Sequence, residues 1–202
     1  MIVFFIVGMP ASGKSTIGKA LAEALSKAFV DQEVQFVEMS DIVRAWRGTR
    51  DINSTEIASQ ELYSLMWHNF YADYADIVVC SGVREPFLVE PPRSQAKLKT
   101  FIVEIRVDRE LRRTWYRARE FSFHKNESDR VSFDTAEARA LDLGMAGLCM
   151  KADMVIPIAA PMLSSSVDST LGTFAGEHGA PIGYVMNCVS QIIGAYVIRS
   201  VS

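Results

Sequence analysis

Residues 8–16 read Gly-Met-Pro-Ala-Ser-Gly-Lys-Ser-Thr, which contains the spacing Gly-x-x-x-x-Gly-Lys-Ser without a gap. A continuous apolar run from Ile2 to Val7 precedes this segment, and apolar residues at helical spacing follow it from Lys14 onward. A glycine-containing turn between a strand and a helix can point its backbone N–H groups inward around an anion, and the positive end of the helix faces the same place. The sequence therefore predicts a phosphate-binding loop that joins a buried strand to a helix.

The residue types in this loop suit the chemistry of a bound nucleotide. The predicted cofactor-binding cradle consists of Gly8, Ala11, Ser12, Gly13, Lys14, Ser15 and Thr16. Lys14 adds a positive charge that can reach the β- and γ-phosphates, so we expect it to be a catalytic residue. The Ser15 hydroxyl can bind Mg²⁺, which makes Ser15 the first candidate metal ligand.

Composition limits the class of protein. The chain has 202 residues, 49% of them hydrophobic and 22% charged, which is ordinary for a single soluble domain. The net charge of −3 gives no whole-chain argument for nucleic-acid binding, although residues 84–130 hold 12 of the 21 lysines and arginines. Cys80, Cys149 and Cys188 are odd in number and widely spaced, which predicts a reducing, cytoplasmic location rather than a zinc site or a disulfide framework.

Short apolar runs alternate with helical patterns along the chain. The expected strands span 2–7, 34–39, 77–80, 101–107 and 154–158, and the expected helices begin at Lys14 or span 54–75, 109–120 and 133–150. This alternation predicts an α/β fold with a parallel sheet. In such sheets ligands bind beyond the carboxyl ends of the strands, so the segments that follow the five strands should share one crevice.

Three polar residues after strand ends are candidates for binding an acceptor. Asp41 could orient or deprotonate a hydroxyl, or hold a Mg²⁺-bound water, and we expect it to be catalytic as well as substrate-binding. The alternative for Asp41 is a helix N-cap, and one residue can do both. Arg44 and Arg84 could each bind an anionic group in a bidentate manner, with a surface ion pair as the alternative.

The densest run of positive charge consists of Arg109, Arg112, Arg113, Arg117 and Arg119 on one expected helix. The polar stretch 121–132 follows it. Together, residues 109–132 are interpreted as a lid that brings arginines onto the phosphates when it closes, with Arg112 and Arg119 as catalytic candidates. The alternative is a solvated basic helix.

Residues 161–202 contain little charge, and Ile182–Ile198 is uncharged and mostly apolar. We expect this segment to pack on the domain formed by residues 1–160 or to make a homo-oligomer contact. A transmembrane helix is the weaker alternative, because the run is near the short limit and contains polar residues and glycines. No membrane association is expected.

Four segments, taken in order, resemble a known family. Residues 8–15 look like the P-loop of nucleoside monophosphate kinases and, more closely, of archaeal-type dephospho-CoA-kinase-like proteins. Residues 38–44 are similar to that family's Met-Gly-Asp-Val-Val-Arg segment, and residues 78–84 to its Val-Val-Ile-Asp-Gly-Ile-Arg segment. Leu143-Gly144 followed by the Ala-Asp-x-x-Ile of residues 152–156 completes the match. Phage deoxynucleotide kinases and phage kinases of modified DNA bases look like relatives of this group.

The resemblance implies a P-loop NTPase fold with a five-stranded parallel sheet in the order 2-3-1-4-5, flanked by helices, and an arginine-rich lid. It also implies ATP with Mg²⁺ as the donor and a nucleotide-like acceptor. Two departures matter. The Walker B position, Asp in the family, is Ser81 here, so Mg²⁺ would be held through water by Asp41 or Ser81. Pro157 stands where the family usually has Asn, which puts the purine contacts at that point in question.

Three functions follow from these features. The leading hypothesis is an ATP-dependent phosphotransferase that acts on a nucleoside monophosphate or a dephospho-CoA-like acceptor. The second is a kinase of DNA, acting on a modified base or a strand end, which the basic region 84–130 and the aromatic residues Tyr63, Trp67 and Tyr71 motivate. For those aromatics, core packing is the alternative to base stacking. The third is a non-catalytic nucleotide-binding switch, which Ser81 and the unusual C-terminal segment motivate.

Overall fold

The computed structural model describes residues 1–48, 59–72, 75–90, 98–123, 131–158, 174–175 and 180–201. Its centre is a five-stranded sheet in the order β2-β3-β1-β4-β5, in which all neighbouring strands are parallel. The strands are β1 (Ile2–Val7), β2 (Val34–Glu38), β3 (Ile77–Ser81), β4 (Lys99–Val107) and β5 (Met154–Ile158). The predicted α/β fold and the predicted strand order are confirmed.

Strand β1 occupies the middle of the sheet because its side chains are apolar on both faces. Phe5 belongs to one core cluster with Met66 and Phe70, and Phe4 belongs to the other with Leu21. A strand buried on both faces requires a continuous apolar run rather than alternating apolar and polar residues. The sequence of β1 meets this requirement and delivers the chain to the phosphate-binding loop at a fixed point.

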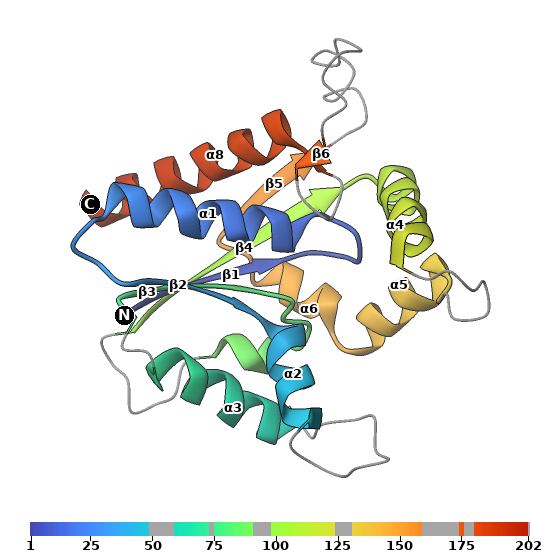
Figure 1. The fold of residues 1–202 in the computed structure, drawn as a ribbon, viewed down its shortest axis with the longest axis horizontal. Helices are drawn as coiled ribbons and strands as arrows, with labels where there is room; N and C mark the ends of the chain where they lie inside the picture. Colours follow the sequence, from blue (N-terminus) through green and yellow to red (C-terminus); the bar gives the residue numbers. More distant parts are fainter. Residues whose placement is uncertain are drawn as a thin grey trace.

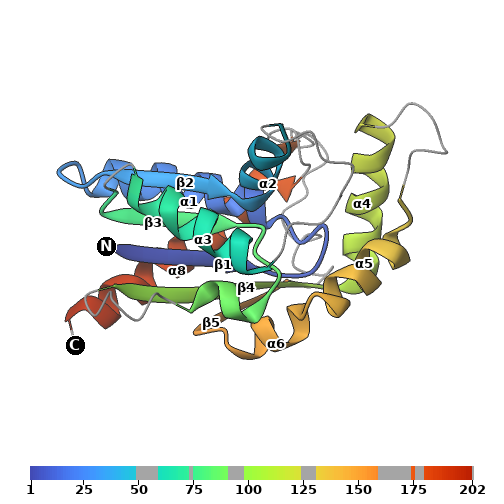
Figure 2. The same ribbon diagram turned by 90° about the horizontal axis from the view of Figure 1, so that it is seen from below.

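Helices cover both faces of the sheet (Figure 1). One face carries α1 (Lys14–Ala28) and α8 (Ile182–Val201), and the other carries α3 (Ser59–Ala72), the 3₁₀ helix η1 (Pro86–Val89) and α6 (Met145–Met150). Three further helices lie toward the carboxyl ends of the strands, as Figure 2 shows: α2 (Met39–Gly48), α4 (Arg109–Phe123) and α5 (Phe133–Asp142). The short strands β6 (Phe174–Ala175) and β7 (Ala180–Pro181) pair antiparallel in a separate sheet.

Helix α8 of the C-terminal segment lies against α1. Cys188, Val189 and Ile192 are buried in the same core cluster as Leu25 of α1, and the ring of Tyr196 packs against aromatic rings of β1 and β4. Within the described part of the chain, no helix combines the length and apolar character that spanning a bilayer requires. Residues 159–173, which make up much of the segment before α8, lie outside the described residues.

The start of α2 corrects the predicted end of the second strand. Strand β2 ends at Glu38, one residue earlier than predicted, and α2 begins immediately at Met39. Asp41 is therefore the third residue of the helix and not its N-cap, so that alternative is wrong. An acidic residue in the first turn is still favourable there, because it faces the positive end of the helix.

The helix predicted over 133–150 is interrupted. Gly144 adopts a φ of 95°, which is left-handed, so α5 ends before it and α6 starts after it. A Cβ at this position would lie 2.8 Å from the Cδ atom of Pro86, so the close approach of η1 also requires glycine. The break turns α6 onto the sheet while α5 projects toward α4.

The aromatic residues of α3 serve the core. Trp67 is only 3% exposed and packs edge to face against Phe5 and Phe70, with ring centroids 6.2 and 5.3 Å away. Tyr63 stacks on Phe87 at 6.0 Å. Packing is thus confirmed for Trp67 over a base-stacking role. The side chain of Tyr71, residues 54–58 of the predicted helix and residues 124–130 of the predicted lid lie outside the described residues.

Candidate active site

The phosphate-binding loop joins β1 to α1 through a backbone that side chains rarely tolerate. Ala11 and Gly13 have φ angles of 59° and 78°, both in the left-handed region. At Gly8, a Cβ would lie 2.6 Å from the carbonyl oxygen of Ile105 in β4. A tight turn of this kind directs consecutive backbone N–H groups toward one concave side.

The loop is suited to an anion. Gly13 is the N-cap of α1 and offers no side chain to the free N–H groups of the first helical turn. The Ser12 hydroxyl is buried and has no hydrogen-bond partner among the described residues. A pocket at this point is lined by Ala11, Gly13, Lys14, Ser15 and Thr16 of the loop, and by Trp115 and Arg119 of α4 across from them. The structure therefore gathers five of the seven predicted cradle residues around one pocket, while Gly8 and Ser12 shape the loop itself.

Lys14 lies in a strongly positive environment. Its Nζ atom donates a hydrogen bond to the carbonyl oxygen of Met9, 3.3 Å away. Burial, together with nearby positive charges led by that of Arg84, lowers the pKa of Lys14 to about 8, against the opposing effect of the Glu38 carboxylate. Arg119 and Arg112 act in the same direction as Arg84. Excess positive charge of this kind is what an incoming polyphosphate would neutralise.

Glu38 supplies a carboxylate that the sequence interpretation missed. It is the last residue of β2 and lies beside Ser81, the last residue of β3, in the register of the two strands. The Ser81 hydroxyl donates a hydrogen bond to Glu38 Oε2. Gly82, with a φ of 88°, leaves room for the other oxygen of Glu38, because a Cβ there would collide with it. A carboxylate therefore lies beside Ser81, although position 81 itself carries none.

Asp41 and Arg44 do not line the pocket of the phosphate loop. They form an ion pair on the surface of α2, with Arg44 Nη1 2.7 Å from Asp41 Oδ1. The side chain of Asp41 is 65% exposed and that of Arg44 is 74% exposed. A pair of this exposure contributes little to stability. Both residues remain candidates for the acceptor side, beyond the end of β2.

Arg84 lies close enough to Lys14 for its charge to lower the pKa of that lysine, and the predicted binding of an acceptor by Arg84 stays a prediction. Burial lowers the pKa of the Arg84 guanidinium, and the positive charge of Arg139 lowers it further. Arg139 lies on α5 and was not a predicted site residue, because the sequence shows it only as one position of a helix. Its closeness to Arg84 depends on α5 folding back toward β3.

Arg112 is buried and fixed. Its side chain is 7% exposed, and it donates to the carbonyl oxygens of Val107 at 3.2 Å and Pro10 at 3.4 Å. Its Nη2 atom lies 2.6 Å from Oε1 of Glu137 in α5. This placement favours a role in positioning the loop backbone over the mobile, catalytic role predicted for Arg112.

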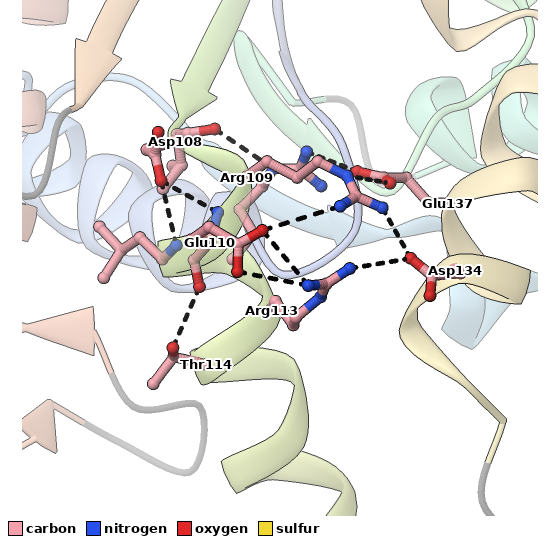
Figure 3. A network of polar contacts seen from close by, with 10 residues as sticks. Asp108, Arg109, Glu110, Arg113, Thr114, Asp134 and Glu137 are labelled. Atoms are coloured by element: carbon pink, nitrogen blue, oxygen red, sulfur yellow. Dashed lines mark hydrogen bonds and ion pairs between the residues drawn. The ribbon is translucent and has the colours of Figure 1, made fainter.

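The neighbouring arginines bind α5 as well (Figure 3). Arg109 contacts Asp134 at 2.6 Å and Glu137 at 2.8 Å, and Arg113 contacts Asp134 at 3.3 Å. These arginines hold the pKa of the Asp134 carboxyl below its usual value. Burial alone raises the pKa of Glu137, but its hydrogen bonds to Arg112 and Arg109 bring it below the usual value. Ion pairs to α5 thus engage Arg109 and Arg113, whose side chains are 47% and 28% exposed, and the lid formed by residues 109–132 stays a prediction.

Of the predicted lid arginines that the structure describes, Arg119 is the one that lines the phosphate pocket. Its guanidinium lies 4.8 Å from the centre of the Tyr116 ring. Arg119 therefore lines one pocket with Lys14 and Ser15, and its contact with phosphate stays a prediction.

Comparisons with known proteins support the fold. No protein-family model matches the chain. Shikimate kinase 2 of Syntrophotalea carbinolica is 43% identical over 53 residues, which are 23% of this chain and 31% of that protein. The chain thus matches about a third of the length of this curated relative.

Two solved structures resemble almost the whole chain. Shikimate kinase from Acinetobacter baumannii in complex with shikimate has a TM-score of 0.51 at 16% identity, covering 99% of this chain and 95% of that one. A gluconokinase from Sinorhizobium meliloti has a TM-score of 0.50 at 12% identity, covering 98% and 97%. These proteins are neither dephospho-CoA kinases nor phage kinases, so that finer resemblance stays a prediction. The chain has the α/β fold of the P-loop kinases, with its sheet in the order 2-3-1-4-5.

Proposed function

We propose that this protein is an ATP-dependent phosphotransferase that moves the γ-phosphate of ATP to a small anionic acceptor. One observation carries the proposal: the phosphate-binding loop and the uncapped first turn of α1 open onto a pocket lined by Lys14 and Arg119, and the charge of Arg84 acts on Lys14 from nearby. Phosphoryl transfer mainly needs groups that hold the phosphates in line and groups that neutralise the phosphate oxygens. Both kinds of group lie beyond the carboxyl ends of the strands of this sheet.

The chain's own residues have distinct tasks in this reaction. The backbone N–H groups of the loop and the first turn of α1 bind the phosphates, and Lys14 places its charge among them. Arg119 approaches from α4 on the opposite wall. Because these donors are already in place, they can stabilise charge on the transferred group with little reorganisation.

Ser15, Glu38 and Ser81 fit a Mg²⁺ ion. Ser15 would contribute its hydroxyl, and Glu38, oriented by the hydrogen bond from Ser81, would hold a water of the ion. Among the described residues no cluster of three or more metal-binding side chains exists, which suits an ion held largely by phosphates and water. When bound, Mg²⁺ would neutralise the β- and γ-phosphate oxygens. Glu38 would thus take the part that the sequence analysis gave to Asp41 or Ser81.

The acceptor side is proposed to lie between β3, α2 and α5. Arg84 and Arg139 would bind its anionic group, and Asp41 and Arg44 would contact it from α2. The nucleotide-type acceptor predicted from sequence, a nucleoside monophosphate or a dephospho-CoA-like molecule, satisfies this charge. Shikimate and gluconate, the small acids named by the structurally similar kinases, satisfy it as well.

The other two functions have less support. A DNA kinase would need a broad basic surface, but Arg109, Arg112 and Arg113 are engaged by acidic residues of α4 and α5. The argument for a non-catalytic switch was that Ser81 provides no carboxylate for Mg²⁺. The carboxylate of Glu38, which accepts a hydrogen bond from Ser81, weakens that argument.

The test is transfer of label from γ-labelled ATP to a panel of nucleoside monophosphates, dephospho-CoA, shikimate, gluconate and single-stranded DNA. We expect one class of small acid to be labelled, with transfer lost in Lys14→Ala. Lys19→Ala is the matched control, because Lys19 is an exposed lysine on the same helix and should transfer at the wild-type rate. A Lys14→Ala protein that transfers at the wild-type rate would refute the proposal. ATP binding without transfer to any acceptor would favour the switch, and labelled DNA would favour the second alternative.

A further inference from the structure

Tyr116 of α4 is held from two directions. Its side chain is buried, with 4% of the residue exposed. Its hydroxyl donates a hydrogen bond to the carbonyl oxygen of Val131 at 3.1 Å. Its ring packs edge to face against Phe133, with centroids 5.6 Å apart and an interplanar angle of 68°. Val131 and Phe133 both follow residues 124–130 in the chain, so Tyr116 ties the middle of α4 to the start of α5.

Phe133 is itself fixed. The guanidinium groups of Arg109, Arg112 and Arg113 lie 5.4, 5.4 and 5.6 Å from the centre of its ring. The same arginines are anchored by the carboxylates of α5. Tyr116 therefore packs against a rigid support and not against a mobile side chain.

The Tyr116 ring in turn supports Arg119. The Arg119 guanidinium lies over the ring at 4.8 Å, and Arg119 lines the phosphate pocket with Lys14 and Ser15. An arginine side chain has many rotamers, and restricting them costs free energy that weakens its contact with a ligand. A guanidinium stacked on a fixed aromatic face has already lost much of this freedom, and the stack favours the charged group by cation–π attraction.

We propose that Tyr116 is a positioning residue that holds Arg119 in the phosphate pocket and thereby sets the affinity of the pocket for ATP. The inference rests on the proposed function, because Arg119 is there assigned a contact with phosphate. Arg119 is thus placed before the nucleotide binds. Contacts that run from Glu137 and Asp134 through the arginines of α4 to Phe133 and Tyr116 hold it there.

A double-mutant cycle tests this with ATP·Mg²⁺ as the probe and isothermal titration calorimetry as the readout. Arg119→Ala should weaken binding about tenfold or more, the size expected for a hydrogen bond to a charged group. Tyr116→Leu should weaken it about two- to tenfold, since it removes the cation–π face. In Arg119→Ala, adding Tyr116→Leu should cause no further loss. Tyr116→Phe keeps the ring and should stay within about twofold of the wild type.

Structural damage is separated from positioning in two ways. Melting temperatures accompany every variant, and Tyr116→Met fills the site with a flexible apolar chain that has no aromatic face. If Tyr116→Leu does not fold, Tyr116→Met replaces it in the cycle with the same expected result.

Each outcome decides the matter. Losses that add in the double variant would overturn the inference and leave the proposed function intact. An Arg119→Ala protein with wild-type affinity for ATP would overturn the assigned role of Arg119 and the inference with it. A non-additive cycle in a protein that transfers phosphate to no acceptor would support the inference while the proposed function fails.

Discussion

Loss of the Glu137 carboxylate should destabilise the fold strongly, because two arginines of α4 bind it. This carboxylate accepts hydrogen bonds from Arg112 Nη2 at 2.6 Å and from Arg109 Nε at 2.8 Å. The side chains of Arg112 and Glu137 are only 7% and 12% exposed, so Glu137→Ala leaves the Arg112 guanidinium buried without its carboxylate. Arg112 also donates to Pro10 in the phosphate loop, so the change should loosen the loop as well as the contact between α4 and α5.

The size of the effect follows from burial. Removing one partner of a buried ion pair costs about 3–5 kcal/mol, because the remaining charge is not solvated. For a chain of this length, this corresponds to a fall in melting temperature of about 6–20 °C. Arg109 adds little to the loss, since its side chain is 47% exposed and remains bound to Asp134.

The assay is urea and thermal unfolding followed by circular dichroism, with Glu110→Ala as the matched control. Glu110 belongs to the same set of ion pairs (Figure 3), but its side chain is 70% exposed, so its loss should cost less than about 1 kcal/mol. If Glu137→Ala is no more destabilising than Glu110→Ala, the Arg112–Glu137 pair does not hold α4 to α5, and the reasoning is refuted.

Three further predictions concern the site and its supports. Because the pKa of Lys14 is lowered to about 8, ATP binding should take up a proton and weaken as the pH rises above about 8, when the free lysine loses its charge. Calorimetry in buffers of different ionisation enthalpy measures this uptake, and an equal uptake in Lys14→Ala would assign it elsewhere. Glu38→Gln should reduce the gain in ATP affinity that Mg²⁺ provides, whereas Asp41→Asn should leave this gain unchanged. The gain is measured as the difference in affinity between solutions with Mg²⁺ and with EDTA. If Asp41→Asn reduces the gain and Glu38→Gln does not, Asp41 and not Glu38 holds the ion. Gly144→Ala should lower the free energy of unfolding by about 1–3 kcal/mol, because Gly144 has a φ of 95°. Gly194→Ala should stabilise the fold slightly, because Gly194 faces open space on α8. Equal melting temperatures of the two variants would contradict the strain at Gly144.

The sheet and the phosphate loop were predictable because their signals are local. A strand buried on both faces has a continuous apolar run, as in β1, and the glycine spacing of the loop fixes its conformation within a few residues. The alternation of strands and helices then predicted a parallel sheet, whereas the strand order was implied by the family resemblance. None of these inferences needed to know which side chains meet.

The polar pairings were not predictable for the opposite reason. Glu38 matters because it lies beside Ser81, and that register appears only once β2 and β3 are paired. Arg112 could be identified as a cation near the site, but its burial against Glu137 depends on α5 folding back along α4. A count of charges in residues 84–130 suggested a basic surface, because the acidic partners on α5 come later in the sequence.

The central claim is that the phosphates gathered by Lys14 and its neighbours are transferred and not merely bound. Phosphorus NMR of ATP·Mg²⁺ with the protein and the pooled small acids follows binding and transfer in one sample. We predict that the ATP resonances decline while those of ADP and one new phosphate product grow, and that Lys14→Ala shows neither change. ATP resonances that shift on binding but give no phosphate product with any acceptor would contradict the claim.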